Sequence, residues 1–175
     1  SYLCPIKNGI QYLDCMVESV LSQNNDAVEI VFVDGKSTDG TYERLLELQK
    51  QAPHNIQVYI EENDGARPGP GRAWNNAASK ARGDILGWLG CDDASVPGAT
   101  DFAIRFFDSN PDVNLITGHC RIIDSDGRQI MMHLARQTSR EELLAGVNPI
   151  SCPASFYRAT LFHKVGGVDS YGNDF

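Results

Sequence analysis

Asp84-Ile-Leu-Gly-Trp-Leu-Gly-Cys-Asp-Asp93 is the stretch of sequence that decides the fold. Residues 85–89 are apolar and uncharged, which is typical of a strand buried on both faces of a parallel sheet. The strand ends on two adjacent carboxylates, and Pro97-Gly98 then separates it from the next amphipathic run. Ligands of open α/β sheets bind outside the carboxyl ends of the strands. Two carboxylates at that place either suit Mg²⁺ or Mn²⁺, with substrate phosphates completing the shell, or merely cap the next helix.

Short apolar segments alternate with amphipathic segments on both sides of this stretch. Hydrophobic periodicity predicts strands at 1–5, 28–33, 56–60 and 85–89 and helices at 10–21, from 39–41 onward, at 73–81 and at 99–107. Strands that alternate with helices imply a parallel sheet with right-handed crossovers. The sequence therefore predicts a single α/β domain.

The second half of the chain has a more mixed pattern. Residues 113–123 and 129–133 flank Asp124-Ser-Asp-Gly127, which predicts a β-hairpin. The other expected elements are a short helix opened by the capping box Ser139-Arg-Glu-Glu142, a last strand at 150–157 and a last helix at 158–165.

Composition narrows the class of protein. A chain of 175 residues favours one domain, and a net charge of −8 argues against a nucleic-acid-binding surface, which needs concentrated Lys and Arg. No apolar run approaches the roughly 20 residues of a membrane span. The five cysteines are odd in number and contain no Cys-x-x-Cys, so neither a disulfide framework nor a zinc site is expected. A reducing, cytoplasmic location, including the cytoplasmic face of a membrane, fits this pattern.

Acidic side chains follow three of the predicted strands. Asp34 comes after 28–33, Asp64 soon after 56–60, and Asp92 and Asp93 after 85–89. Each acid taken alone is more typical of a cap or turn. Because the carboxyl ends of parallel strands lie along one edge of a sheet, we expect these acids to share a crevice that binds a nucleotide.

Three segments of the chain carry a further signature. They are Val31-Phe-Val-Asp-Gly-Lys-Ser-Thr-Asp-Gly-Thr41, the stretch from Gly71 to Asp93, and Pro149–Arg158 followed by Leu161–Asp169. In this order they resemble the patterns VVD-G-STDGT, A-x-N-x-G…A-x-G-[DE]-[IY]-[IL]-x-[FW]-L-[ND]-x-DD and F-R-R-x-L-F-x-K-[IV]-GG-[FV]-D of family 2 glycosyltransferases. The resemblance spans nearly the whole chain.

The resemblance implies a Rossmann-like GT-A fold and a function. A sugar would pass, with inversion, from a nucleotide-diphosphate sugar to an acceptor hydroxyl, on a glycan or a lipid-linked acceptor, with the help of Mn²⁺ or Mg²⁺. Carried over by position, Asp34, Asp39, Asp64 and Arg72 belong to the nucleotide-sugar site. Asp93 is the stronger candidate for the metal ligand, and Asp92 lies nearer the ribose or sugar while sharing the metal.

Some positions depart from the family pattern. Gly90 stands where the family often has Asp or Asn, so only two acids of that motif remain. Cys152 stands where related sequences often have His. The family's catalytic carboxylate lies beyond the GG-x-D segment, and Asp174 is the candidate base closest to that region, at a short offset from Asp169. We therefore expect residues 1–175 to be one catalytic domain shortened at its C-terminus, so that the true base could lie past Phe175. The first strand could also lack its opening residues.

Two other functions remain open at this level. One is a non-catalytic or truncated domain that binds nucleotide sugars. The other is a sugar nucleotidyltransferase, which normally has a Gly-rich loop with Lys or Arg directly after its first strand. Cys4-Pro-Ile-Lys-Asn-Gly9 offers a single Lys there, which makes this function the weaker alternative.

Overall fold

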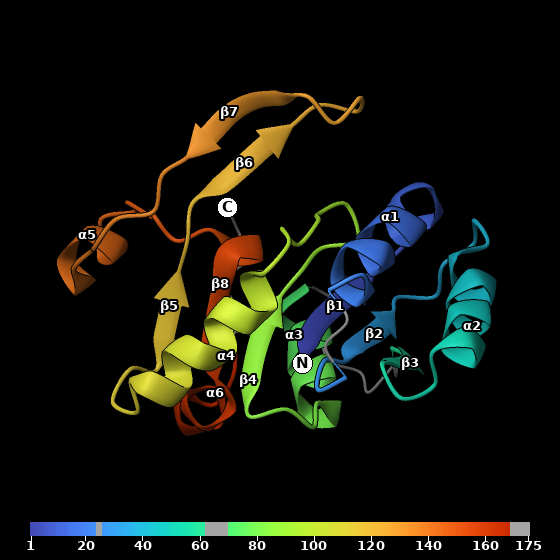
Figure 1. Ribbon diagram of the computed structural model, residues 1–175, viewed down its shortest axis with the longest axis horizontal. Helices are drawn as coiled ribbons and strands as arrows, with labels where there is room; N and C mark the ends of the chain where they lie inside the picture. The colour runs from blue at the N-terminus through green and yellow to red at the C-terminus, as the bar shows by residue number, and fades with distance from the viewer. Residues whose placement is uncertain (24–25, 62–69, 169–175) are drawn as a thin grey trace.

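The main sheet has six strands. A computed structural model describes residues 1–23, 26–61 and 70–168 (Figure 1). The strand order is β3-β2-β1-β4-β8-β5, in which β1, β2, β3 and β4 are parallel and β8 runs antiparallel to both β4 and β5. The strands are β1 (Tyr2–Ile6), β2 (Ile30–Asp34), β3 (Ile56–Ile60), β4 (Ile85–Trp88), β5 (Leu115–Thr117) and β8 (Ser155–Arg158). The predicted α/β class with a mainly parallel sheet is confirmed.

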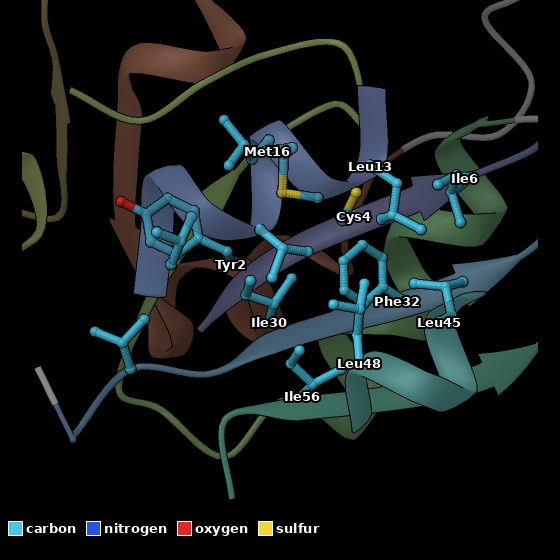
Figure 2. Close-up of a cluster of buried hydrophobic side chains, with 14 residues drawn as sticks. Tyr2, Cys4, Ile6, Leu13, Met16, Ile30, Phe32, Leu45, Leu48 and Ile56 are labelled. Atoms are coloured by element: carbon cyan, nitrogen blue, oxygen red, sulfur yellow. The ribbon is translucent and has the colours of Figure 1, made fainter. Parts of the chain in front are cut away.

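Helices cover both faces of this sheet (Figure 1). The helices are α1 (Ile10–Leu21), α2 (Thr41–Gln51), α3 (Pro70–Lys80), α4 (Ala99–Ser109), α5 (Arg140–Leu144) and α6 (Ala159–Val165). In α1 the buried residues Leu13, Met16, Val17 and Val20 recur at the spacing of one helix face. They pack with Phe32 and Leu45 on one face of the sheet, which forms the larger cluster of Figure 2.

The opposite face is packed by α3 and α6. Ala73, Ala77 and Ala78 of α3 lie against Val31 and Val33 of β2. Small side chains let the helix approach the sheet closely, as their clustering in the sequence predicts. Every residue of β2 is buried. Burial on both faces explains why this strand has no alternation of apolar and polar residues.

Two predicted segments are wrong in their bounds. Residues 113–123 were expected as one arm of a hairpin, but they form β5 and β6 (Cys120–Ile123), which belong to different sheets. The extended segment is interrupted at Gly118, whose N–H donates to the Ala154 carbonyl at 2.8 Å. Strand β5 therefore pairs with β8, while β6 pairs with β7 (Gln129–His133). Residues 150–157 were expected as a strand. They begin instead with a 3-10 turn at Cys152–Ala154 that contains Pro153, and the strand starts at Ser155.

Helix α2 begins at Thr41, as predicted for 39–41, although neither Asp39 nor Thr41 but Gly40, with φ 93°, is the N-cap. The Asp39 carboxylate accepts hydrogen bonds from the Thr41 N–H at 3.0 Å and the Thr41 hydroxyl at 2.5 Å. The capping box at Ser139 and Glu142 is confirmed.

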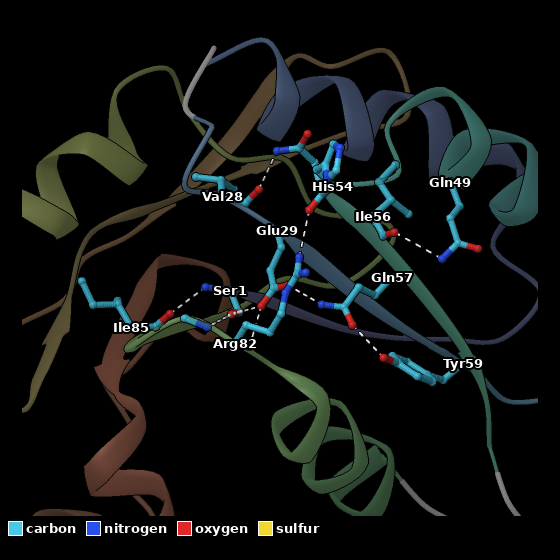
Figure 3. Close-up of polar contacts among 12 residues, drawn as sticks. Ser1, Val28, Glu29, Gln49, His54, Ile56, Gln57, Tyr59, Arg82 and Ile85 are labelled. Carbon is cyan, nitrogen blue, oxygen red and sulfur yellow. Dashed lines mark hydrogen bonds and ion pairs between the residues drawn. The ribbon is translucent and has the colours of Figure 1, made fainter.

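The buried carboxylate of Glu29 joins three parts of the chain at the amino ends of the parallel strands (Figure 3). Glu29 is 5% exposed and accepts hydrogen bonds from the Ser1 hydroxyl at 2.6 Å, the Arg82 N–H at 2.6 Å and Gln57 Nε2. Arg82 Nε lies 2.7 Å from the same carboxylate. This network fixes the ends of strands β1, β2 and β4 relative to each other.

Within the described parts of the chain, no helix combines the length and the apolar character needed to cross a membrane. All five cysteines are free, as the sequence predicts.

Candidate functional site

The Asp92 and Asp93 carboxylates meet over Gly90, in the turn that follows β4. The Gly90 N–H donates to Asp93 Oδ2 at 3.0 Å, and the Asp93 N–H donates to the Gly90 carbonyl at 3.1 Å. A Cβ atom placed on Gly90 would lie 2.8 Å from Asp92 Oδ1 and 2.9 Å from Asp93 Oδ2. Two carboxylate oxygens therefore border one small space, which is open because residue 90 has no side chain.

The electrostatics of this turn disfavour two negative charges. Burial raises the pKa of Asp93, and the neighbouring charge of Asp92 raises it further, against the opposing effect of the Gly90 N–H. Asp92 itself is exposed. A cation bound between the two carboxylates would remove the repulsion and favour the charged form of Asp93.

This space fits a hard divalent cation held jointly with a substrate. Among residues 1–23, 26–61 and 70–168, no group of three or more His, Cys, Asp or Glu side chains could hold a metal. Two carboxylates alone are the ligand set with which Mg²⁺ is commonly held when substrate phosphates supply the rest. The donor atoms are hard oxygens, which also suit Mn²⁺. Because residue 90 is glycine, the space beside the two carboxylate oxygens stays open: a Cβ there would lie within 2.9 Å of both.

Replacing Gly90 by alanine is expected to weaken cation binding at this turn by about ten-fold. The added Cβ forces both carboxylate oxygens away from the space that they border, and displacement of ligand or supporting groups typically costs 10–100-fold in metal affinity. The measurement is calorimetric titration of the variant with Mn²⁺ and a nucleoside diphosphate. Gly118→Ala is the matched control, because its Cβ would meet its nearest neighbour at an ordinary 3.7 Å. Equal affinities for the two variants would contradict this account of Gly90.

Asp34 is the last residue of β2, and Asp39 lies in the loop that follows it. Asp34 is buried, and its two oxygens accept hydrogen bonds from the Ser37 N–H at 2.9 Å and the Ser37 hydroxyl at 2.5 Å. Asp39 is exposed and also accepts from the Ile10 N–H at 3.2 Å. The hydrogen bond from the Thr41 hydroxyl is the main reason that the pKa of Asp39 is lowered.

The loop after β1 is bound to the loop after β2. Asn8, with φ 55°, accepts a hydrogen bond from the Thr38 N–H at 2.8 Å and donates its own N–H to the Ser37 hydroxyl at 2.9 Å. The Gly9 N–H donates to the Thr41 hydroxyl at 3.0 Å. These contacts hold both loops in one rigid unit at the carboxyl end of the sheet.

The two acidic groups are neighbours. Strand β1 separates β2 from β4, and the loop after β1 touches the turn after β4: a Cβ on Gly9 would meet the Cys91 sulfur at 2.7 Å. Burial raises the pKa of Cys91, and the charges of Asp92, Asp93 and Asp39 raise it further. Asp34, Asp39 and the carboxylate pair thus follow or end neighbouring strands at one edge of the sheet, and their sharing of a nucleotide-binding crevice stays a prediction. Cys91 is a packed thiol in acidic surroundings, which disfavours a reactive thiolate.

Arg72 lies in the first turn of α3. Its Nε and Nη2 donate to Glu61 Oε1 at 3.0 and 2.8 Å, and both side chains are largely buried. Glu61 follows β3, so this ion pair occupies the carboxyl end of that strand. Asp64 and Asp174, the other two site residues predicted from the sequence, lie outside the described residues.

Asn75 of α3 clamps the chain after α6. Its Nδ2 donates to the Val168 carbonyl at 2.8 Å, and its Oδ1 accepts from the Val168 N–H at 2.8 Å. Gly167 has φ 84°, and a Cβ there would collide with Asn75 Oδ1. The Asn of the A-x-N pattern and the second Gly of the GG-x-D pattern are thus two sides of one contact.

Asn75→Ala is expected to lower the free energy of unfolding by about 1–2 kcal/mol, because it leaves a backbone N–H and a carbonyl of Val168 without their partner. Urea denaturation followed by circular dichroism measures the change. Asn76→Ala is the control, since position 76 points about 100° away around the same helix. Alanine has a higher helix propensity than asparagine, so a loss as large in the control would contradict the assignment of the effect to the clamp.

Sequence reasoning missed Asn8, Ser37 and Thr41 as site-building residues. Ser37 and Thr41 stand inside the quoted signature, but their partners lie about 30 residues away along the chain. Asn8-Gly9 was considered only as part of the Cys4–Gly9 segment, which offers a single Lys. Asn adopts a positive φ more readily than most residues, and Asn8 does so here. The sequence alone does not distinguish Asn8 from the other Asn residues.

The chain is similar to known glycosyltransferases. The family model described as "Glycosyl transferase family 2" matches residues 1–166. An uncharacterized glycosyltransferase of Nostoc sp. is 31% identical over 140 residues, which is 80% of this chain and 42% of the relative. TuaG of Bacillus subtilis, a putative teichuronic acid biosynthesis glycosyltransferase, is 37% identical over 93 residues, which is 53% of this chain and 35% of the relative. The chain thus spans less than half the length of these relatives.

Two solved structures share the fold. TarS of S. aureus in complex with UDP-GlcNAc aligns with a TM-score of 0.70 and 21% identity, covering 94% of this chain and 46% of that chain. The mannosyltransferase PcManGT of Pyrobaculum calidifontis, in complex with GDP-Man and Mn²⁺, aligns with a TM-score of 0.69 and 18% identity, covering 95% of this chain and 46% of that chain.

Proposed function

Because this chain belongs to glycosyl transferase family 2 and has the GT-A fold, we propose that it carries the nucleotide-sugar site of a transferase that acts in glycan or polysaccharide assembly. The sugar would move from a nucleoside-diphosphate donor to an acceptor hydroxyl, with inversion at the anomeric carbon. The observation that carries the proposal is the pair of carboxylate oxygens that border the space over Gly90.

Asp92 and Asp93 would hold Mg²⁺ or Mn²⁺ at the donor diphosphate. When bound, the cation would act as a Lewis acid and offset the charge that gathers on the departing diphosphate. The neighbour in complex with GDP-Man and Mn²⁺ supports this choice of metal. The raised pKa of Asp93 is consistent with a site built to receive positive charge.

The nucleoside would lie on the β2 side of this cation. Asp34 is held by two donors from Ser37, yet each carboxylate oxygen has a second lone pair with which it could accept an N–H or O–H of the base or ribose. Asp39 fixes the loop that places Asp34, so we assign it a positioning role within the nucleoside site. Arg72 serves the same site indirectly, through its ion pair with Glu61 at the end of β3.

The acceptor hydroxyl would attack the anomeric carbon from the face opposite the diphosphate. One carbon–oxygen bond forms as the bond to the diphosphate breaks, through an oxocarbenium-like transition state. A carboxylate takes the proton of the acceptor hydroxyl. Asp174, the candidate for this base, is a proposal from the sequence alone because it lies outside the described residues.

The first experiment is calorimetric titration of the purified protein with UDP, GDP and dTDP and their sugars, with and without Mn²⁺. A preference for one nucleotide that disappears with EDTA would support the proposal and identify the base. Binding to none of them would overturn the donor site as assigned. Release of free nucleoside diphosphate from the bound donor by the full-length protein separates a transferase from a non-catalytic binding domain.

A further inference from the structure

An apolar cavity of about 550 Å³ lies between β8, α5 and α6. Trp88, Tyr157 and Phe162 form its aromatic walls, and Leu143, Ile150 and Cys152 complete the rim. Its described lining contains no Asp, Glu, Lys or Arg. A volume of this size falls within the range of small-molecule sites, and an uncharged lining favours an uncharged, apolar occupant.

Several polar atoms in the lining already have partners. Trp88 Nε1 donates to the Tyr157 hydroxyl, and Ser155 donates to the Ser151 carbonyl at 2.6 Å. Asn148 Oδ1 accepts from the Ile150 N–H at 3.0 Å. Burial is the main cause that raises the pKa of Tyr157, so its hydroxyl stays neutral. Little in this wall would compensate a sugar or an anion for the water that it loses on entry.

The cavity is adjacent to the carboxylate pair. Strand β8 runs antiparallel to β4, with Phe156 opposite Gly87, so the residues that precede β8 lie beside the residues that follow β4. Cys152 precedes β8, and Asp92 and Asp93 follow β4. Burial raises the pKa of Cys152 and the charge of Asp93 raises it further, as this proximity requires.

The cavity and the nucleoside loops lie on opposite sides of β4. Asn8, Asp34 and Asp39 lie at the carboxyl ends of β1 and β2, whereas the cavity lies on the β8 side. A glycosyl acceptor must approach the sugar from the side away from the nucleoside diphosphate. The cavity is therefore placed where the body of an acceptor would rest while its hydroxyl reaches the carboxylate pair.

We propose that this cavity binds the apolar part of the acceptor, an uncharged alkyl or lipid-like group attached close to the hydroxyl that receives the sugar. The inference rests on the proposed function, since it takes the carboxylate pair to mark the donor sugar. It adds the class of acceptor: a neutral amphiphile rather than a free sugar or an anionic polymer, for which a cationic wall would be needed.

The test compares two probes that differ only in their aglycone. n-Octyl β-D-glucoside, below its micelle concentration, and methyl β-D-glucoside are titrated into the protein, with calorimetry and the fluorescence of Trp88 and its stacked neighbour Trp74 as readouts. The octyl glucoside is expected to bind at least ten-fold more tightly, because its alkyl chain leaves water for an apolar wall.

Two neighbouring leucines of α5 provide the matched variants. Leu143 is 42% exposed and lines the cavity, whereas Leu144 is 74% exposed and is not among the residues that line it. Leu143→Asn is expected to weaken octyl glucoside binding about ten-fold, and Leu144→Asn to leave it unchanged. Equal effects of the two variants, or equal affinity for the two glucosides, would overturn the inference.

Binding of UDP, GDP or dTDP with Mn²⁺ in the same samples separates the two proposals. Nucleotide binding without selective octyl glucoside binding overturns the acceptor assignment alone. Failure of the wild-type protein to bind any of the three nucleotides overturns the donor site, and with it the reason for assigning the cavity to an acceptor. Tighter binding of an anionic glycan fragment than of octyl glucoside would also overturn the inference, because it assigns the acceptor to the wrong class.

Discussion

Asp93→Asn is expected to reduce the Mn²⁺-dependent affinity for the nucleoside diphosphate by about 100-fold or more. Removing groups that merely support metal ligands costs 10–100-fold, so the loss of a charged ligand should cost at least as much. Asparagine keeps the size of the side chain and an oxygen that can accept the Gly90 N–H. The change therefore removes the charge and leaves the turn intact.

The same variant should fold at least as stably as the wild type in the absence of metal. The pKa of Asp93 is raised in the folded protein, so its charged form is disfavoured there, and a neutral side chain removes that cost above the folded pKa. With ligand at about 100 times Kd, the wild type should gain about 2.7 kcal/mol, and this gain should be absent from the variant. Thermal unfolding with and without Mn²⁺ and the nucleotide measures both effects.

Asp112→Asn is the control for this experiment, since Asp112 is an exposed acid outside the site. Retention of metal-dependent binding in Asp93→Asn would refute the assignment of Asp93 as a ligand. A variant that is unfolded without metal would instead show that the carboxylate has a structural role that its raised pKa does not indicate.

Glu29→Gln is expected to lower the free energy of unfolding by about 2–4 kcal/mol at neutral pH. The carboxylate is buried and accepts hydrogen bonds from Ser1, Gln57 and Arg82, and breaking a buried ion pair by removing one partner is strongly destabilising. This loss of stability lies toward the lower end for buried ion pairs, because the Arg82 side chain is 62% exposed and water can solvate its charge in the variant. Urea denaturation measures the change.

The effect of this variant should depend on pH. Burial alone would raise the pKa of Glu29, but the hydrogen bonds from Ser1, Arg82 and Gln57 outweigh it and lower the pKa from its usual 4.5. A lowered pKa stabilises the fold above about pH 4.5, and the contribution is lost as pH falls through the folded value. The difference between wild type and variant should therefore be largest at pH 7 and shrink at pH 3–4.

Glu47→Gln is the matched control, because Glu47 pairs with Arg44 on the surface of α2 and is 60% exposed. Such pairs contribute about 0.3–0.5 kcal/mol. If both substitutions had equally small effects, the network of Figure 3 would not contribute to stability as we infer.

Sequence motifs identified the carboxylate pair but not its geometry. Asp92 and Asp93 were identified because they directly follow a short apolar strand, which is a local pattern. The missing acid at position 90 was recorded only as a departure from the family. The space that a Cβ at position 90 would fill depends on side-chain positions that no sequence pattern contains.

Long-range pairings were the least predictable part of the fold. Residues 113–123 were expected as one arm of a hairpin, yet the Gly118 N–H donates to the carbonyl of Ala154, 36 residues later, and the segment is divided between two sheets. The partner of Glu29 was also not foreseen, since Arg82 lies 53 residues away. Local propensity cannot identify such partners because it acts over only a few residues.

The sequence by itself determined the α/β class, the order of strands and helices in the first half, and the place of the acids at strand ends. These follow from hydrophobic periodicity and turn residues, which act over neighbouring positions. Only the tertiary structure decided that Asn8 joins two loops, that Asn75 clamps Val168, and that a neutral cavity lies beside Asp93. Each of these depends on contacts between distant segments, whose geometry is set when the sheet and its helices pack together.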